Sequence, residues 1–83
     1  MLHSATKFLG GHSDLVAGLA VTRTADLGQR LKQVQNSVGA ILGPQDSWLL
    51  LRGMKTLSVR LDAQQSTASG LAARLNALPG IRH

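Results

Sequence analysis

One short apolar run limits what this chain can fold into. Residues 15–22, Leu-Val-Ala-Gly-Leu-Ala-Val-Thr, lie between Asp14 and Arg23 and are the best strand candidate among the 83 residues. Continuous apolar character over this length is typical of a strand buried on both faces of a parallel sheet. A single strand leaves its backbone N–H and C=O groups without partners on both sides. We therefore expect the chain either to need a partner sheet or to fold differently.

The remainder of the sequence has helical patterns. Asp26 can cap a helix over about 26–42, and a glycine and a proline at 43–44 end it and begin another. A long helical segment over about 45–78 follows, as one or two helices, and Pro79 stops it. Gly53 and Gly70 lie inside it at a cost of about 1 kcal/mol each relative to alanine, and such glycines often permit close helix packing. The apolar residues at helical spacing are Leu27, Leu31, Val34, Val38 and Ile41, then Leu50, Met54, Leu57 and Leu61, then Ala68, Leu71, Ala72, Leu75 and Leu78.

Charge and composition exclude several function classes. The net charge of +5 allows a nucleic acid or an acidic membrane as partner, but the basic residues are spread along the chain and there are two aromatic residues for base stacking. We expect no nucleic-acid partner. Cysteine is absent, and His3, His12 and His83 have no metal-ligand spacing, so neither a disulfide nor a metal site is predicted. No apolar run approaches the ~20 residues of a membrane span, and a cytoplasmic location is the default expectation.

The chemistry of the chain is concentrated near its start, in the run Ser-Ala-Thr-Lys-Phe-Leu-Gly-Gly-His-Ser-Asp at 4–14. Ser4, Thr6 and Lys7 place two hydroxyls and one amine within four positions, before a turn softened by glycines. Hydroxyls can donate hydrogen bonds to phosphate oxygens, and lysine is the side chain that forms Schiff bases with carbonyl compounds. Taken alone, Lys7 is better explained as a solvated surface lysine, and the alternative for Ser4 and Thr6 is a role as turn or cap hydroxyls.

The same run resembles the cofactor-lysine motif of the Cys/Met-metabolism pyridoxal-phosphate enzymes, the group of cystathionine gamma-synthase and the cystathionine lyases. The resemblance continues through Gln-Asn-Ser-Val-Gly-Ala at 35–40 and through 43–57, Gly-Pro-Gln-Asp-Ser-Trp-Leu-Leu-Leu-Arg-Gly-Met-Lys-Thr-Leu, followed by Val-Arg-Leu at 59–61. Three ordered motifs over nearly the whole chain make this a strong signal.

The resemblance implies an α/β fold, in which residues 1–83 are part of the large, cofactor-binding domain of a fold type I (aspartate-aminotransferase-like) enzyme. Within the chain we expect the lysine turn and one short strand over 4–22, and helices beyond. Lys7 would be the catalytic Schiff-base lysine for pyridoxal 5'-phosphate, with Ser4 and Thr6 binding its phosphate. The family is homo-oligomeric and acts on amino acids of the cystathionine or activated homoserine class. Arg52 and Arg60 receive no catalytic role, and Trp48 is interpreted as a packing residue.

Three interpretations remain open. The chain is an internal segment of a transsulfuration enzyme and is inactive alone, because the family's ring-stacking aromatic residue, its aspartate at the pyridine nitrogen and its carboxylate-binding arginine have no counterpart here. Alternatively, it is one part of a split enzyme that a complementary chain completes. The third interpretation is a small basic helical interaction module whose cofactor motif is vestigial.

Overall fold

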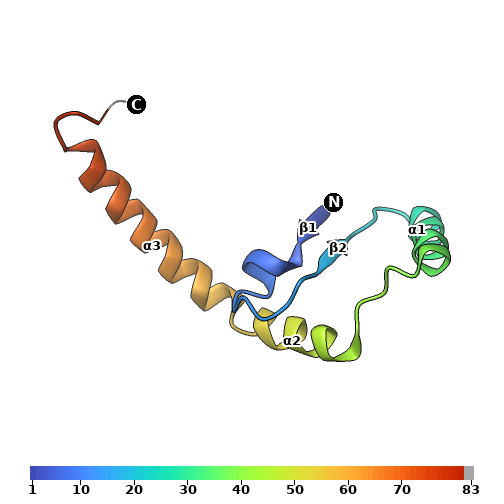
Figure 1. Ribbon diagram of the computed structural model, residues 1–83. Helices are drawn as coiled ribbons and strands as arrows, with labels where there is room; N and C mark the ends of the chain where they lie inside the picture. The colour runs from blue at the N-terminus through green and yellow to red at the C-terminus, as the bar shows by residue number, and fades with distance from the viewer. Residues whose placement is uncertain (82–83) are drawn as a thin grey trace.

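Two short strands form a sheet in the computed structural model of this protein, which describes residues 1–81 (Figure 1). β1 (Leu2–Ser4) pairs antiparallel with β2 (Gly18–Ala20), and His3 lies opposite Leu19. Hydrogen bonds of 2.8 and 2.9 Å between the backbones of Met1 and Val21 extend the pairing. The sequence predicted one strand, and the chain supplies a partner for it on one side from its own N-terminal residues.

The expected burial of this strand on both faces of a parallel sheet is not observed. All residues of β1 and β2 are exposed, and their pairing is antiparallel. The sheet and α1 (Ala25–Val38) do not close on each other, so the strands stay exposed on the side of this helix. An open groove of about 720 Å³ lies between them, lined on the sheet side by Leu2 and Leu19 and on the helix side by Leu31 and Val34.

Local sequence sets the ends of α1. The side chain of Thr24, not the expected Asp26, caps its N-terminus by accepting a hydrogen bond of 3.4 Å from the Leu27 N–H. Gly39 adopts φ 76° at the other end, a left-handed conformation that terminates helices. The helix therefore ends before residue 42, the predicted limit.

The helical segment expected over about 45–78 consists of α2 (Pro44–Met54) and α3 (Leu57–Asn76). The break falls at Lys55 and Thr56, whose N–H groups bond back three residues to Arg52 and Gly53, both at 3.2 Å. This tighter turn redirects the chain, so that α3 projects away from the remainder of the molecule (Figure 1).

The buried core is small and lies where the N-terminal turn meets α2. Among the described residues the buried hydrophobic side chains are Ala5, Leu15 and Leu50. Trp48 is 56% exposed, with the guanidinium of Arg52 5.7 Å from its ring centre, so it does not pack into this core. The radius of gyration is 18.0 Å, whereas a compact domain of this length has about 12 Å. The chain is thus extended, and a small core joins its N-terminal turn to α2.

Candidate functional site

Lys7 lies in a short π-helical segment, η1 (Ala5–Leu9), directly after β1. Its own φ and ψ, −86° and −115°, interrupt the helical run. The Gly10 N–H donates to the Ala5 carbonyl and the Gly11 N–H to the Lys7 carbonyl, both at 2.8 Å. The backbone of Lys7 is therefore held from its C-terminal side, while its side chain is exposed.

Thr6 ties this segment to the strand that follows the turn. Its Oγ1 accepts a hydrogen bond of 2.9 Å from the Ala17 N–H and lies 3.3 Å from the Ala17 carbonyl oxygen, to which it donates. The Thr6 N–H donates to that same carbonyl at 3.2 Å. The hydroxyl is consequently fixed in position by two backbone groups of Ala17.

Ser4 is placed differently from Thr6. It ends β1 opposite Gly18 and is exposed. The two hydroxyls are separated because the chain leaves the extended conformation after Ser4 and enters η1 at Ala5. The structure therefore aligns the hydroxyl of Thr6 with the lysine turn and leaves Ser4 at the edge of the sheet.

A pocket of about 490 Å³ brings Lys7 and Thr6 together. Its volume is within the range of about 300–1,000 Å³ for small-molecule sites. Val16 lines it from the turn before β2, and Arg60 and Gln64 line it from the first turns of α3. Ser4 is not among the lining residues. The lining therefore combines the exposed amine of Lys7 with the hydroxyls of Thr6 and Ser13 and the guanidinium of Arg60, donors that suit a ligand bearing both a carbonyl and an anionic group.

Gly53 of α2 lets the lysine turn pack directly on this helix. It is buried, and a Cβ at this position would overlap the Gly10 carbonyl oxygen and come within 3.1 Å of the Leu9 carbonyl oxygen. The close packing that sequence reasoning attached to Gly53 is thus present within the chain. At Gly70, in contrast, no atom lies within 4 Å of where a Cβ would stand.

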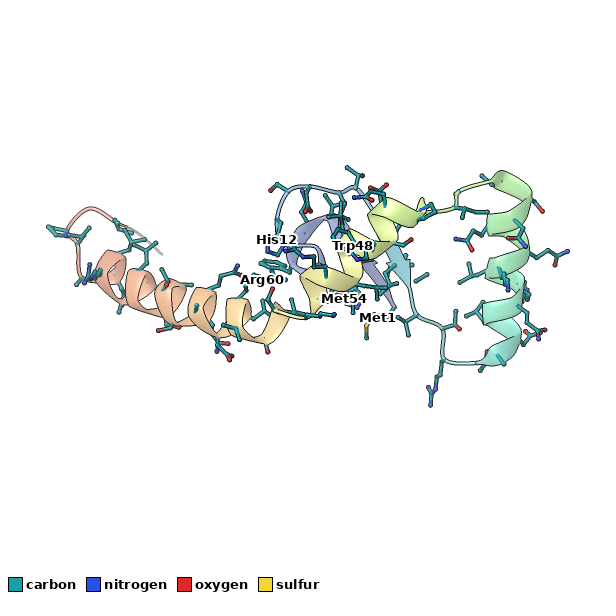
Figure 2. The ribbon with its side chains drawn as sticks, turned by 90° about the horizontal axis from the view of Figure 1, so that it is seen from below. Met1, His12, Trp48, Met54 and Arg60 are labelled. Atoms are coloured by element: carbon teal, nitrogen blue, oxygen red, sulfur yellow. The ribbon has the colours of Figure 1, made fainter. Side chains whose placement is uncertain are left out.

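Arg60 is the residue of this region that sequence reasoning left without a role. Its Nη1 donates to the Phe8 carbonyl at 2.9 Å, its Nη2 to the Gly53 carbonyl at 2.8 Å and its Nε to Thr56 Oγ1 at 3.1 Å. Arg60 thus lies where α2, α3 and the N-terminal turn meet (Figure 2). Residues 8 and 60 are 52 positions apart, so no local sequence signal could have indicated the contact.

His12 takes part in the turn. Its Nδ1 lies 2.7 Å from the Gly10 carbonyl oxygen, so this nitrogen carries the proton. Within residues 1–81 no group of three or more potential ligands is arranged to hold a metal ion. In the same part of the chain, no helix is both long and apolar enough to cross a membrane. His83 lies outside the described residues.

Comparison with known proteins identifies the family. The sequence profile described as Cys/Met metabolism PLP-dependent enzyme matches residues 1–83. A cystathionine gamma-lyase of Bacillus subtilis is 55% identical over 82 residues, which are 99% of this chain and 22% of that protein. A cystathionine beta-lyase of Lactococcus lactis is 56% identical over 87% of this chain and 19% of that protein. The chain therefore spans about a fifth of the length of these relatives.

A solved structure gives the same result for the fold. The crystal structure of cystathionine gamma-lyase from Lactobacillus plantarum, complexed with L-serine, superposes with a TM-score of 0.95 at 48% identity over 99% of this chain and 22% of that one. The expected fold class, a part of the large domain of an α/β pyridoxal-phosphate enzyme that is mostly helical, is confirmed. The second strand, β1, is the feature that the sequence did not predict.

Proposed function

The chain belongs to the Cys/Met metabolism PLP-dependent enzyme family, and on that premise we propose that Lys7 is the cofactor lysine of a transsulfuration enzyme. The observation that carries this proposal is the pocket in which the exposed Lys7 side chain and the Thr6 hydroxyl lie together. When bound, pyridoxal 5'-phosphate supplies an aldehyde and an electron-withdrawing ring that stabilises negative charge on a substrate carbon. Lys7 would hold that aldehyde, and its Nζ would be the group that moves protons beside it.

Thr6 is suited to hold the phosphate because its hydroxyl proton can be redirected. The Ala17 carbonyl to which it donates also receives the Thr6 N–H at 3.2 Å. Turning the hydroxyl proton towards a phosphate oxygen therefore leaves no backbone group without a partner, and the Ala17 N–H continues to hold Oγ1 in place. Ser4 would be the second phosphate donor, although it ends β1 outside the lining of this pocket.

The reaction class follows from the relatives. Their names are cystathionine gamma-lyase, cystathionine beta-lyase and cystathionine gamma-synthase/O-acetylhomoserine (thiol)-lyase. We propose an amino-acid substrate of the cystathionine or activated homoserine class, processed in a homo-oligomeric enzyme. Residues 1–83 hold the lysine side of such a site, so we propose that they show no turnover alone and need further protein, from the same or a complementary chain, to orient the substrate.

The chain contains its own controls for Lys7, because Lys32 on α1 and Lys55 after α2 are also exposed. The experiment incubates the chain with pyridoxal 5'-phosphate, reduces the adducts with borohydride and measures modification at each lysine by peptide mass spectrometry. We expect Lys7 to be modified several-fold faster than Lys32 or Lys55, and this preference to shrink with pyridoxal, which has no phosphate. Equal modification of the three lysines would contradict the proposal.

The alternative of a small basic interaction module is not favoured by these comparisons, which match the whole chain to one enzyme family. It predicts salt-sensitive binding of nucleic acid or protein that survives Lys7→Ala. Filter binding of single-stranded DNA over a salt series, with both forms of the chain, tests this alternative. We expect no binding above that of a control peptide of equal charge.

A further inference from the structure

We propose that Arg60 is a positioning residue for Lys7, because its guanidinium fastens the lysine turn to the junction of α2 and α3. The role of Lys7 itself rests on the proposed function. The attachment rests on hydrogen bonds that Arg60 makes to three separate parts of the chain: to η1 at Phe8, to α2 at Gly53 and to the α2–α3 turn at Thr56.

The two carbonyls that Arg60 binds lie near the C-terminal ends of η1 and α2. The last carbonyls of a helix have no partner within that helix, and a cation is favoured there by the helix dipole. Arg60 donates to one carbonyl near the end of each segment at the same time, and at Gly53 its bond adds to those from the N–H and the hydroxyl of Thr56. Since Phe8 directly follows Lys7, this contact fixes the Phe8–Leu9 peptide, one residue beyond the lysine.

The planar guanidinium is the group that this arrangement requires. Its Nη1, Nη2 and Nε reach Phe8, Gly53 and Thr56 simultaneously, at 2.8 to 3.1 Å. A lysine ammonium on a flexible stem lacks the rigid fork that holds acceptors in fixed directions. Lysine at position 60 would therefore keep the charge but retain only part of the attachment.

At Gly11 the lysine turn lies directly against the guanidinium of Arg60. It has φ 76°, and a Cβ at this position would overlap the guanidinium. Its N–H is the donor that holds the Lys7 carbonyl. Arg60 also lines the pocket that contains Lys7 and Thr6. The guanidinium thus contacts the lysine turn and also lines the pocket.

Thr56 supports Arg60 in turn. Its Oγ1 accepts from Arg60 Nε at 3.1 Å and donates to the Gly53 carbonyl at 3.2 Å. Removing this hydroxyl should loosen Arg60 without removing its charge. The pair Thr56→Val and Thr56→Ser therefore separates the attachment from the charge, since serine keeps the hydroxyl and valine keeps the shape.

The experiment compares Arg60→Met and Arg60→Lys with Arg74→Met, which removes the same charge from the exposed last turn of α3. The first readout is hydrogen exchange of the Gly11 amide, which bonds to the Lys7 carbonyl. The second is the ratio of borohydride-trapped adduct at Lys7 to that at Lys32. We expect Arg60→Met to accelerate Gly11 exchange and lower the ratio by about tenfold each, from the loss of charged hydrogen bonds. Arg60→Lys should be intermediate, and Arg74→Met unchanged.

The outcomes separate this inference from the proposed function. Equal modification of all lysines in the unsubstituted chain counts against the role of Lys7, while Gly11 exchange still tests the attachment by Arg60. Normal Gly11 exchange and a normal Lys7 ratio in Arg60→Met would overturn the inference. If Arg60→Met loses helical circular dichroism, Thr56→Val decides: it should shift both readouts in the same direction by less, and Thr56→Ser should restore them. Identical results for the two Thr56 variants would equally overturn the inference.

Discussion

Thr6 has one hydroxyl proton and two possible acceptors for it, the Ala17 carbonyl and a phosphate oxygen of the proposed ligand. In the structure the Ala17 carbonyl takes it at 3.3 Å, while the shorter bond, 2.9 Å, runs from the Ala17 N–H to Oγ1. The hydroxyl oxygen therefore holds the turn by accepting the Ala17 N–H, while the hydroxyl proton can be donated to a ligand. Arg60 is comparable, since one side chain both holds the turn and lines the pocket.

The role of the Thr6 hydroxyl as acceptor of the Ala17 N–H can be measured by amide hydrogen exchange. Thr6→Val keeps the shape of the side chain but removes the acceptor of the Ala17 N–H, so we expect that amide to exchange about two- to tenfold faster, as for one lost hydrogen bond. Thr6→Ser keeps the acceptor and should preserve its protection. Unchanged Ala17 exchange in the valine variant would show that the 2.9 Å bond does not hold the turn.

At the scale of elements, the lysine turn depends on how closely α2 can approach it. Gly53 is buried against the backbone of Leu9 and Gly10, and Leu50, one turn earlier on α2, contributes to the small core. The junction of α2 and α3 then places Arg60 beneath the same turn. Two helices thus support η1, one by backbone contact and one by a side chain.

Alanine at two glycines should have opposite effects. In Gly53→Ala the new methyl meets the Gly10 carbonyl, so α2 must shift, and we expect a loss of about 1–3 kcal/mol in the free energy of unfolding. In Gly70→Ala the methyl meets nothing within 4 Å, and a better helix former should stabilise α3 by about 0.5–1 kcal/mol. Thermal unfolding followed by circular dichroism checks both, and a stabilised Gly53→Ala would contradict the packing described above.

At the scale of the whole molecule, many large apolar side chains are exposed and few are buried. Among residues 1–81 the core contains three buried hydrophobic residues, and the largest dimension is 55 Å. The apolar stripe of α1 is exposed over its whole length, with Leu27 at 44% and Val38 at 73%. Soluble monomers rarely leave such contiguous apolar surface uncovered.

We therefore expect the 83-residue chain to self-associate at high concentration through the stripe of α1. Leu31→Glu should weaken this association, because it places a charge within the stripe, whereas Gln29→Glu adds the same charge outside it. Sedimentation velocity over a concentration series measures the effect. A chain that stays monomeric throughout, or equal effects of both substitutions, would contradict this expectation.

The sequence alone determined the features that depend on near neighbours. It located the helices, because apolar spacing along a helix and the glycine and proline at 43–44 act within a few residues. It also identified the lysine motif and, through the ordered resemblance, the family and the fold class. The roles of Lys7, Ser4 and Thr6 remain proposals with tests.

Features that depend on contacts between distant residues could not be derived this way. The pairing of β1 with β2, the approach of Gly53 to Gly10 and the attachment of Phe8 by Arg60 each join residues from different parts of the chain. The turn at Lys55 and Thr56 aims α3 so that Arg60 reaches the lysine turn. The direction of each helix is set by how the elements pack in space. The contact of Arg60 with the lysine turn therefore depends on the tertiary structure and cannot be derived from the sequence alone.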